Sequence, residues 1–376
     1  SSISALRFSL RHSTYIRTPR SSGFARLELE TFFIAIYMRC LWTFKNKKMT
    51  QTETKQNPPI LYMGPIRGGT DHIYRNTFAA HFDGYDLAVA PFINCIGTNK
   101  ITPKYVRVLL PENNTGMPVI PQILSKSAEG FYRLANVLTD MGYDTINWNL
   151  GCPYPQVARK QRGSGLLPHT DKIRQFLDEA IPKLQGKLTI KTRLGREHKD
   201  ELFRLIPIFN EYPIEEVIIH ARTGKQMYEG VPDVDAFETA LSMCKHPVVY
   251  NGDIRSAEDF KRLSERFIDI SRWMIGRWAL VDPFLPMIIK TGKDTTEAEH
   301  KVKKMKAFHD DLYDQYTRVL HGPSHTMDRM KGLMMSFTLA FKDNKKTLKK
   351  IKKARSPEQY AAAVNHFFDE EAEWNC

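Results

Sequence analysis

Short apolar runs alternate with longer amphipathic segments from residue 59 onward, and this alternation constrains the fold more than any other feature of the chain. Apolar runs of four to eight residues are typical of buried strands, whereas apolar residues three and four apart are typical of helices. The runs are ILYMG, DLAVA, PVIPQI, TINWNL, KLTIKTRL, EVIIHAR, PVVYNG and SRWMIG. Strand then helix, repeated about eight times, predicts parallel strands joined by helical crossovers.

Two architectures have this element order: an open doubly wound sheet and a closed barrel. An open dinucleotide-binding sheet usually carries G-x-G-x-x-G after its first strand, and the first run here is followed by no such motif. Eight units over roughly 250 residues match a (β/α)₈ barrel. We therefore predict an α/β fold, a (β/α)₈ TIM barrel over residues 57–295.

Beyond about residue 296 the strand signals stop, and three segments have the apolar spacing of helices. They predict a C-terminal helical domain over residues 296–376. This region has a dense basic run, and the whole chain has a formal net charge of +13, which favours a polyanionic partner such as nucleic acid. A solvated helix face is the alternative explanation of the run. The run consists of Lys342, Lys345, Lys346, Lys349, Lys350, Lys352, Lys353 and Arg355.

Residues 1–56 differ from the rest, and we expect an extension outside the fold. No acidic residue precedes Glu28, and arginines stand among serines, which is typical of an organellar transit peptide. Our preferred interpretation is that Met49 is the natural start and that a disordered polar stretch follows it. The apolar run at residues 32–37 is too short to span a bilayer, so we expect no membrane association.

The five cysteines form no C-x-x-C pair, and their number is odd. We therefore expect neither a disulfide framework nor a metal site, and a reducing, cytoplasmic location is favoured. The cysteines are Cys40, Cys95, Cys152, Cys244 and Cys376.

Polar or charged residues stand two apart at the ends of four predicted strands. Because strand side chains alternate between faces, the members of each pair point the same way. Barrel active sites lie at the C-terminal ends of the strands. A single polar pair there is explained by an ion pair or a capped strand end, whereas four pairs at equivalent places predict a ligand site. The pairs are Asn147 and Asn149, Lys191 and Arg193, His220 and Arg222, and Asn251 and Asp253.

The ligand can be partly described from the last two strands, which end in NGD (residues 251–253) and IGR (residues 275–277). Loops after the seventh and eighth strands usually bind phosphate in such barrels, through backbone amides that glycine leaves accessible. Arg277 adds positive charge there. Lys191 and His220 suit an electron-rich ring near the barrel axis. A ring with one phosphate predicts a mononucleotide cofactor, for which FMN fits better than NAD.

Cys152 follows the fourth predicted strand in NLGCPYPQV, between a glycine and a proline. A buried core cysteine is the simplest interpretation. The flanking turn residues instead favour a loop at the C-terminal face of the barrel. An unperturbed cysteine is mostly a thiol at neutral pH, so Cys152 is a candidate general acid as well as a nucleophile.

Six motifs in this order resemble those of the tRNA-dihydrouridine synthases, and the resemblance covers about residues 60 to 370. That family comprises FMN-dependent (β/α)₈ barrels with a C-terminal helical RNA-binding domain. The motifs are GPIRGGTD, NLGCP followed by Val157 and RGSGLL, KTRLG, HARTGKQMYEG, NGDI and IGRWALVDPF. Gly64 and Ile66 replace the usual Ala and Met of the first motif, and Asp282 replaces the usual Asn before Pro283.

The resemblance implies a role for individual residues. Cys152 is expected to protonate the substrate uracil and Asn149 to orient it, and we assign Arg193 and Arg222 to substrate binding as well. The residues expected to bind the flavin are Pro65, Ile66, Arg67, Gln122, Lys191, His220, Asn251, Gly252, Asp253, Gly276 and Arg277.

The resemblance also implies the reaction, a reduction of uridine to dihydrouridine in tRNA. Hydride is expected to pass from reduced FMN to C6 of the uracil, and the Cys152 thiol to deliver a proton to C5, with NADPH or NADH restoring the flavin. We expect tRNA to bind through the barrel mouth and the basic helical domain of a monomer. Rival hypotheses are an FMN barrel acting on a free pyrimidine, like a dihydroorotate dehydrogenase, a non-catalytic RNA-binding barrel, and a cysteine hydrolase.

Overall fold

The computed structural model describes residues 58–95, 106–343 and 345–375. The extension predicted for residues 1–56, with Cys40 and Met49, lies outside the described residues, as does Cys376. By their contacts, residues Pro58–Cys376 form one compact unit. The division near residue 295 into a catalytic barrel and an RNA-binding helical domain therefore stays a prediction.

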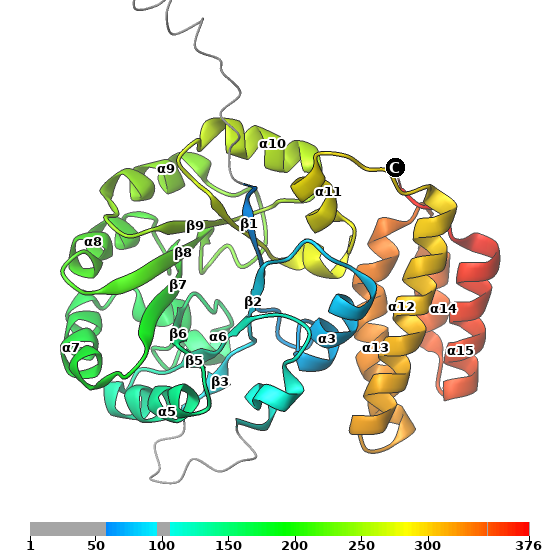
Figure 1. Cartoon of the computed structure of the whole chain (residues 1–376), viewed down its shortest axis with the longest axis horizontal. Helices are drawn as coiled ribbons and strands as arrows, with labels where there is room; N and C mark the ends of the chain where they lie inside the picture. The colour runs from blue at the N-terminus through cyan, green and yellow to red at the C-terminus, as the bar shows by residue number, and fades with distance from the viewer. Residues whose placement is uncertain (1–57, 96–105, 344, 376) are drawn as a thin grey trace, which may run out of the picture. The chain divides into compact units, whose positions relative to one another are not determined.

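The predicted barrel is confirmed by one parallel sheet with the strand order β3-β5-β6-β7-β8-β9-β10-β1-β2-β4 (Figure 1). All eight apolar runs of the sequence lie on these strands. The strands are β1 (Ile60–Met63), β2 (Leu87–Val89), β3 (Ile93–Asn94), β4 (Val119–Ile120), β5 (Gln122–Leu124), β6 (Thr145–Leu150), β7 (Lys187–Gly195), β8 (Ile214–Thr223), β9 (Val248–Asn251) and β10 (Arg272–Ile275).

Two positions along the barrel wall are occupied by broken strands, and their pairing closes the sheet. The chain is interrupted around Pro91 between β2 and β3, and at Pro121 between β4 and β5. Proline has no N–H for the ladder, so regular pairing stops at both places. Since β2 pairs with β4 and β3 pairs with β5, the two ends of the strand order join. The ten strand segments thus occupy the eight strand positions of a closed barrel, with β2 and β3 sharing one position and β4 and β5 another.

The register places the polar pairs predicted from the sequence beside one another. Asn149 lies opposite Lys191, and His220 lies between Arg193 and Asn251 on the neighbouring strands. Below them a separate apolar cluster fills the barrel with side chains from five of its strands, as expected for a packed interior. The cluster consists of Tyr62, Val89, Ile218, Val249 and Met274.

Helices surround the barrel and begin where the sequence provides caps. Ser127 and Ser256 each accept a backbone N–H of their own helix, which satisfies an otherwise unpaired donor. On the outer face of β6, Trp148 stacks on Phe176 with the ring centroids 3.7 Å apart. The helices around the barrel are α3 (His72–His81), α5 (Ala128–Asp140), α6 (Pro155–Ala158), α7 (Thr170–Ala180), α8 (Asp200–Phe209), α9 (Val234–Met243), α10 (Ala257–Arg266) and α11 (Leu285–Thr291).

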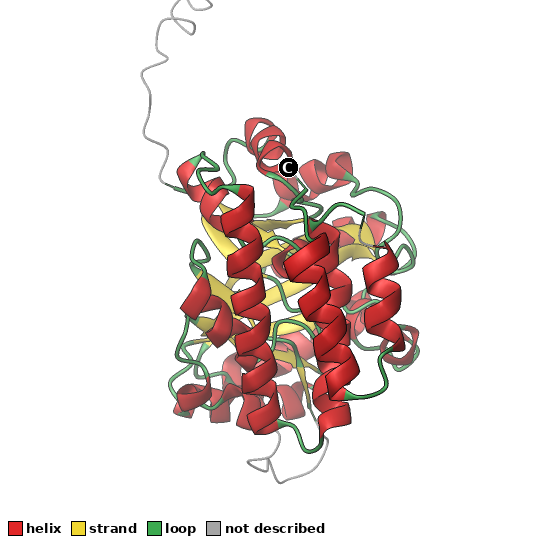
Figure 2. Ribbon diagram, turned by 90° about the vertical axis from the view of Figure 1, so that its right-hand side faces the viewer, coloured by secondary structure: helices red, strands yellow, loops and turns green. Residues whose placement is uncertain are grey.

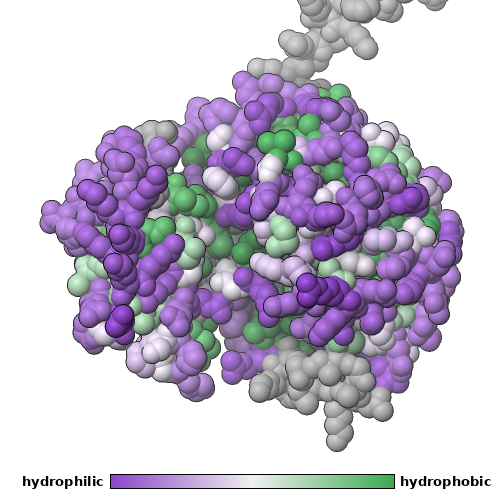
Figure 3. Space-filling view, turned by 180° about the vertical axis from the view of Figure 1, so that it is seen from behind, coloured by the Kyte–Doolittle hydropathy of each residue, from purple (hydrophilic) through white to green (hydrophobic). Residues whose placement is uncertain are grey.

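Four further helices follow the last strand and lie side by side against one flank of the barrel (Figure 2). They are α12 (Ala298–Val319), α13 (Pro323–Phe337), α14 (Lys345–Lys353) and α15 (Pro357–His366). The predicted C-terminal helices are thus present. None of the described helices is long and apolar enough to cross a bilayer. The face shown in Figure 3 is mainly hydrophilic, with hydrophobic side chains gathered in a hollow near its middle.

The C-terminal helices share the hydrophobic core of the barrel. Phe308 of α12 makes edge contacts with Tyr74 and Phe82, the latter just beyond the end of α3. Asp71 adds a polar link, because it caps α3 and also accepts a hydrogen bond of 2.8 Å from the Tyr316 hydroxyl. Arg329 of α13 lies 3.4 Å from the same carboxylate. These contacts hold the loop before α3 against two C-terminal helices.

We expect Tyr316→Phe to lower the free energy of unfolding by about 1 kcal/mol, since the variant loses one buried hydrogen bond but keeps the ring. Urea unfolding of the purified protein measures this change. Tyr313→Phe is the matched control, because the Tyr313 hydroxyl forms no hydrogen bond with any described residue. Equal stability of the two variants would contradict the role given to Asp71.

Candidate functional site

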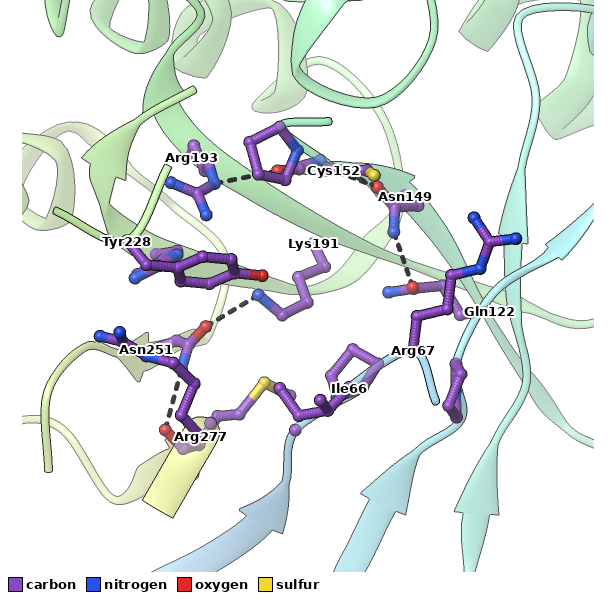
Figure 4. A pocket seen from close by; sticks show the side chains of 18 of the residues that line it. Ile66, Arg67, Gln122, Asn149, Cys152, Lys191, Arg193, Tyr228, Asn251 and Arg277 are labelled. Carbon is purple, nitrogen blue, oxygen red and sulfur yellow. Dashed lines mark hydrogen bonds between the residues drawn. The ribbon is translucent and has the colours of Figure 1, made fainter. Parts of the chain in front are cut away.

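A cavity opens at the C-terminal ends of the strands, with a volume of about 970 Å³ including its open mouth (Figure 4). The structure brings nearly all the residues predicted for the site together in its lining. They are Pro65, Ile66, Arg67, Gln122, Asn149, Cys152, Lys191, Arg193, His220, Asn251, Gly252, Asp253, Gly276 and Arg277.

Arg222, which we expected to contact substrate, does not line the cavity. Its side chain is fully buried behind Asp253, and both of its terminal nitrogens donate to that carboxylate, at 2.8 and 2.7 Å. Because side chains alternate along β8, Arg222 starts on the same inward side as His220. It is two residues further along the strand, however, and its guanidinium turns toward the loop of Glu229 and Gly230, whose carbonyls it also contacts. Arg222 therefore supports the site without facing it.

Sequence reasoning gave no role to several aromatic residues that line the cavity. Tyr228 is the most central of them, because the guanidinium carbons of Arg193 and Arg277 lie 5.3 and 4.9 Å from its ring centre. The two arginines are thereby held on its faces by cation–π contact. The one sequence feature that could have indicated a role for Tyr228 is its place in the HARTGKQMYEG motif. Phe92, Tyr154 and Trp278 also line the cavity. Tyr154 and Trp278 stand in the NLGCPYPQV and IGRWALVDPF segments, which gave them no role, and no quoted segment contains Phe92.

Lys191 points into the middle of the cavity from β7, and its Nζ donates a hydrogen bond of 2.8 Å to Oδ1 of Asn251 (Figure 4). Burial lowers the pKa of Lys191 to about 7, and the positive charge of Arg193 adds to this effect. The amine therefore changes between its charged and neutral forms near neutral pH.

His220 is a neutral hydrogen-bonding group. Burial lowers the pKa of His220 well below its usual value, and the positive charges of Arg193 and Lys191 lower it further. Nη1 of Arg222 lies 3.4 Å from Nε2 of His220. A guanidinium only donates, so Nε2 accepts and the ring proton belongs on Nδ1.

Cys152 stands in the loop after β6 with its thiol buried and facing the same cavity as Lys191. Burial raises the pKa of Cys152, although a backbone hydrogen bond at Tyr154 and the charge of Arg193 act in the opposite direction. The side chain therefore keeps its proton at neutral pH. A protonated sulfur in a cavity has a proton to give, which suits a general acid better than a nucleophile.

Asp253 is held by three arginines at the end of β9. Burial by itself would raise its pKa, but hydrogen bonds from Arg222 and Arg255 bring the pKa of Asp253 down to about 2. Nη2 of Arg277 lies 3.0 Å from the same carboxylate. One carboxylate thus fixes three cations. Among the described residues that line the cavity, Asp253 is the one acidic side chain, against the guanidinium groups of Arg67, Arg193 and Arg277, so the cavity has an excess of positive charge.

The cavity offers distinct places for a flat ring and for an anion. Its apolar floor includes Ile66 and Met274, and a carboxamide wall includes Gln122 and Asn149. At the other end, a Cβ atom built on Gly276 would meet no neighbour closer than 3.7 Å, so the backbone beside Arg277 is accessible to a ligand. A ring-bearing mononucleotide such as FMN fits this arrangement. No group of three His, Cys, Asp or Glu in the described part of the chain is placed to hold a metal ion.

Comparison with known proteins gives a family match over most of the chain. The sequence model of the family "Dihydrouridine synthase (Dus)" matches residues 62–372. A tRNA-dihydrouridine synthase B of Pasteurella multocida is 27% identical over 232 residues, covering 61% of this chain and 69% of the relative. A tRNA-dihydrouridine(16) synthase of Neisseria meningitidis is 28% identical over 246 residues, covering 64% and 73%.

Among solved structures, the chain is similar to an old yellow enzyme homologue from Zymomonas mobilis. The two share 10% sequence identity with a TM-score of 0.46, and the likeness covers 63% of this chain and 90% of the other. A likeness of this degree adds nothing to the fold described above.

The lowered pKa of Lys191 predicts a pH-dependent stability difference between the protein and Lys191→Met. The unfolded chain keeps the ordinary lysine pKa of 10.5, whereas the folded protein releases the proton near pH 7. Between these values the unfolded chain binds more protons, so raising the pH favours the folded state, by up to about 1.4 kcal/mol per pH unit.

Urea unfolding of both proteins, free of small-molecule ligands, measures this difference from pH 6 to pH 10. Relative to Lys191→Met, the unaltered protein should gain stability steadily above pH 7 and show a constant difference below it. A difference that is flat or falls between pH 7 and pH 10 would show that Lys191 keeps its charge.

Proposed function

Since the chain belongs to the dihydrouridine synthase family, we propose that it reduces uridine to 5,6-dihydrouridine in tRNA. The observation that carries the proposal is the position of the buried Cys152 side chain, which lines the same cavity as Lys191 and Gln122, and burial raises the pKa of its thiol. The choice of tRNA is supported by the names of the relatives from Pasteurella multocida and Neisseria meningitidis, both tRNA-dihydrouridine synthases.

We propose FMN as the resident cofactor, with NADPH or NADH as the source of electrons. Lys191, Gln122 and His220 would face its ring, and Pro65, Ile66 and Arg67 would lie along it. Gly252, Gly276 and Arg277 would hold its phosphate, with Asn251 and Asp253 fixing Lys191 and Arg277 by the hydrogen bonds described above. When bound, FMN supplies the hydride that reduction of uracil requires at C6.

Cys152 is the proposed acid of the reaction. Reduction of the C5–C6 bond of uracil requires a proton at C5 in addition to the hydride. Burial keeps the Cys152 thiol protonated, and the cavity brings it within the space that the substrate must enter. The thiol then delivers its proton to C5 and is left as a thiolate, which the nearby charges of Arg193, Arg67 and Lys191 stabilise.

Arg193 and Asn149 are the proposed substrate-orienting residues. Nε and Nη1 of Arg193 are taken up by backbone carbonyls of Gly151, Thr223 and Met227. The guanidinium also forms a hydrogen bond with Tyr228 and lines the cavity, where Nη2 would donate to a uracil carbonyl as negative charge develops during the reduction. Arg222 acts on substrate only through Asp253.

The exposed basic helix α14 is the proposed tRNA contact outside the cavity. Lys345, Lys346, Lys349, Lys352 and Lys353 are exposed and form no ion pair with the described residues. Lys350, by contrast, is bound to Glu371. A row of exposed cations on one helix matches the phosphate backbone of RNA. Target uridines must leave the base stack to enter the cavity, at a cost of a few kcal/mol.

We further propose that the enzyme is monomeric and cytoplasmic.

Replacement of the acid tests the proposal directly. We expect Cys152→Ala to retain the flavin absorption spectrum while losing dihydrouridine formation on unmodified tRNA by about 100-fold, because general acids contribute roughly 10²–10⁴-fold. Cys244→Ala, outside the cavity, is the matched control and should keep full activity. Free uridine should be a poor substrate for the unaltered enzyme. Near-normal activity of Cys152→Ala would remove the acid assignment, and equal turnover of free uridine would remove tRNA as the preferred substrate.

Removal of charge from α14 should weaken tRNA binding in a salt-dependent way. A variant with Lys346, Lys349 and Lys353 replaced by alanine should lower the slope of log affinity against log salt by about 2, since each lost phosphate contact contributes about 0.7–0.9. Filter binding or fluorescence titration at several salt concentrations measures the slope.

The matched control replaces Lys183, Lys187 and Lys245, which are exposed near the N-terminal ends of β7 and β9, opposite the cavity. This control removes the same charge and should leave the slope nearly unchanged. If both variants reduce the slope equally, only overall charge matters and α14 is not a specific contact.

A further inference from the structure

Four buried polar side chains form a continuous line of hydrogen bonds from the barrel core to the Cys152 loop. Thr189 accepts from Nδ2 of Asn147 at 2.8 Å, and Oδ1 of Asn147 accepts from Nε2 of Gln122 at 2.8 Å. Oε1 of Gln122 accepts from Nδ2 of Asn149 at 2.7 Å. All four side chains are at least 94% buried. We call this line the amide chain.

The direction of every hydrogen bond in the amide chain is fixed at its loop end. The backbone N–H groups of Gly151 and Cys152 both point to the same Asn149 side-chain atom, at 3.1 and 2.9 Å. A backbone N–H only donates, so that atom must be the carbonyl oxygen Oδ1. The amide nitrogen of Asn149 must then donate to Gln122, and the same rule carries through to Thr189.

The direction decides which groups the cavity wall presents. Gln122 and Asn149 line the cavity, and each uses one amide N–H inside the chain. Each is left with one N–H for a ligand, while its carbonyl oxygen is already engaged. The wall therefore offers hydrogen-bond donors to a ring, and the same Asn149 oxygen holds the backbone of the acid in place.

Thr189 and Asn147 themselves do not line the cavity, although both belong to the chain. Thr189 has its hydroxyl 3.5 Å from the carbonyl of Ile146, the remaining acceptor at this end. If the hydroxyl is lost, Nδ2 of Asn147 has no acceptor in the chain, and a turned carboxamide would place its nitrogen against Gln122 instead. The buried Asn147 carboxamide would then lack a partner at this end, which loosens its hold on Gln122 and, through Gln122, on Asn149.

We propose that Thr189 and Asn147 are positioning residues that hold Gln122 and Asn149 in place from the core end of the amide chain and thereby keep the Cys152 loop in position. The proposal rests on the proposed function for its effect on turnover, but its effect on the Cys152 loop does not depend on RNA reduction. Thr189 acts through Asn147, because two hydrogen bonds of the amide chain separate Thr189 from Gln122 in the cavity wall.

Three variants on β7 separate the hydroxyl from its packing. Thr189→Val replaces the hydroxyl by a methyl group, and Thr189→Ser keeps the hydroxyl but removes the methyl group. Thr192→Val is the matched control, because Thr192 is equally buried on the same strand but its hydroxyl contacts the Arg193 carbonyl, outside the amide chain.

The first measurement is the pH profile of Cys152 alkylation by iodoacetamide, followed on the Cys152 peptide by mass spectrometry in the purified holoenzyme. A loosened loop exposes the thiol, and exposure removes the cause that raises its pKa. Thr189→Val should therefore shift the midpoint of the profile to lower pH, whereas Thr189→Ser and Thr192→Val should match the unaltered protein.

The second measurement is turnover on unmodified tRNA. Thr189→Val should lower kcat about tenfold with KM changed less than about twofold, since misplacement of a reacting group acts on the chemical step. Thr189→Ser should restore kcat. An unchanged alkylation profile for Thr189→Val, or a Thr189→Ser variant as impaired as Thr189→Val, would overturn the proposal. If the unaltered protein fails to reduce tRNA, the proposed function fails while the alkylation profile still tests the positioning role.

Discussion

Closure of the barrel is the constraint on which the site depends. In a closed parallel sheet, every second residue of each strand must point inward, and the strands all end at the same rim. Residues such as Asn149, Lys191 and His220, which are far apart in sequence, therefore become neighbours without any loop having to bring them together. Placing amides and cations in that interior is costly unless each finds a partner. The hydrogen bonds of Asp253 and of the amide chain are the means by which this cost is met.

Electrostatics then divides the site between groups that hold charge and groups that do not. Burial removes the charge of His220 and keeps the proton on Cys152, whereas Arg222 keeps Asp253 ionised. Lys191 lies between these cases, with a pKa of about 7. Titratable side chains that lie close together thus have different charge states at one pH, because their burial and their partners differ.

Much of this was accessible from the sequence, and particular residues show why. The eight strands followed from apolar runs, and the inward pairs from alternation, because both are local properties of the chain. The interruptions of two barrel strands at Pro91 and Pro121 were not predicted, although a proline within an apolar run is a known signal that regular strand pairing stops. The direction of Arg222 depends on its contact with Asp253, 31 residues away, which no local pattern reports.

The same limit applies to the contacts made across the fold. Tyr228 contacts both Arg193 of β7 and Arg277 just after β10, and Asp71 contacts Tyr316, 245 residues further along the chain. Such contacts exist only once the barrel has closed and the later helices have docked. The extension at residues 1–56 lies outside what the structure describes.

The shared core between α3 and α12 has a consequence for how such enzymes diversify. Phe82 follows α3 and Phe284 precedes α11, and the two rings contact each other and share Lys304 of α12 as a cation–π partner. A helical appendage cannot be exchanged as an independent cassette when its removal uncovers aromatic rings of this kind. Substitutions on the outer faces of the helices, by contrast, change the surface of this part of the molecule without disturbing the aromatic seam.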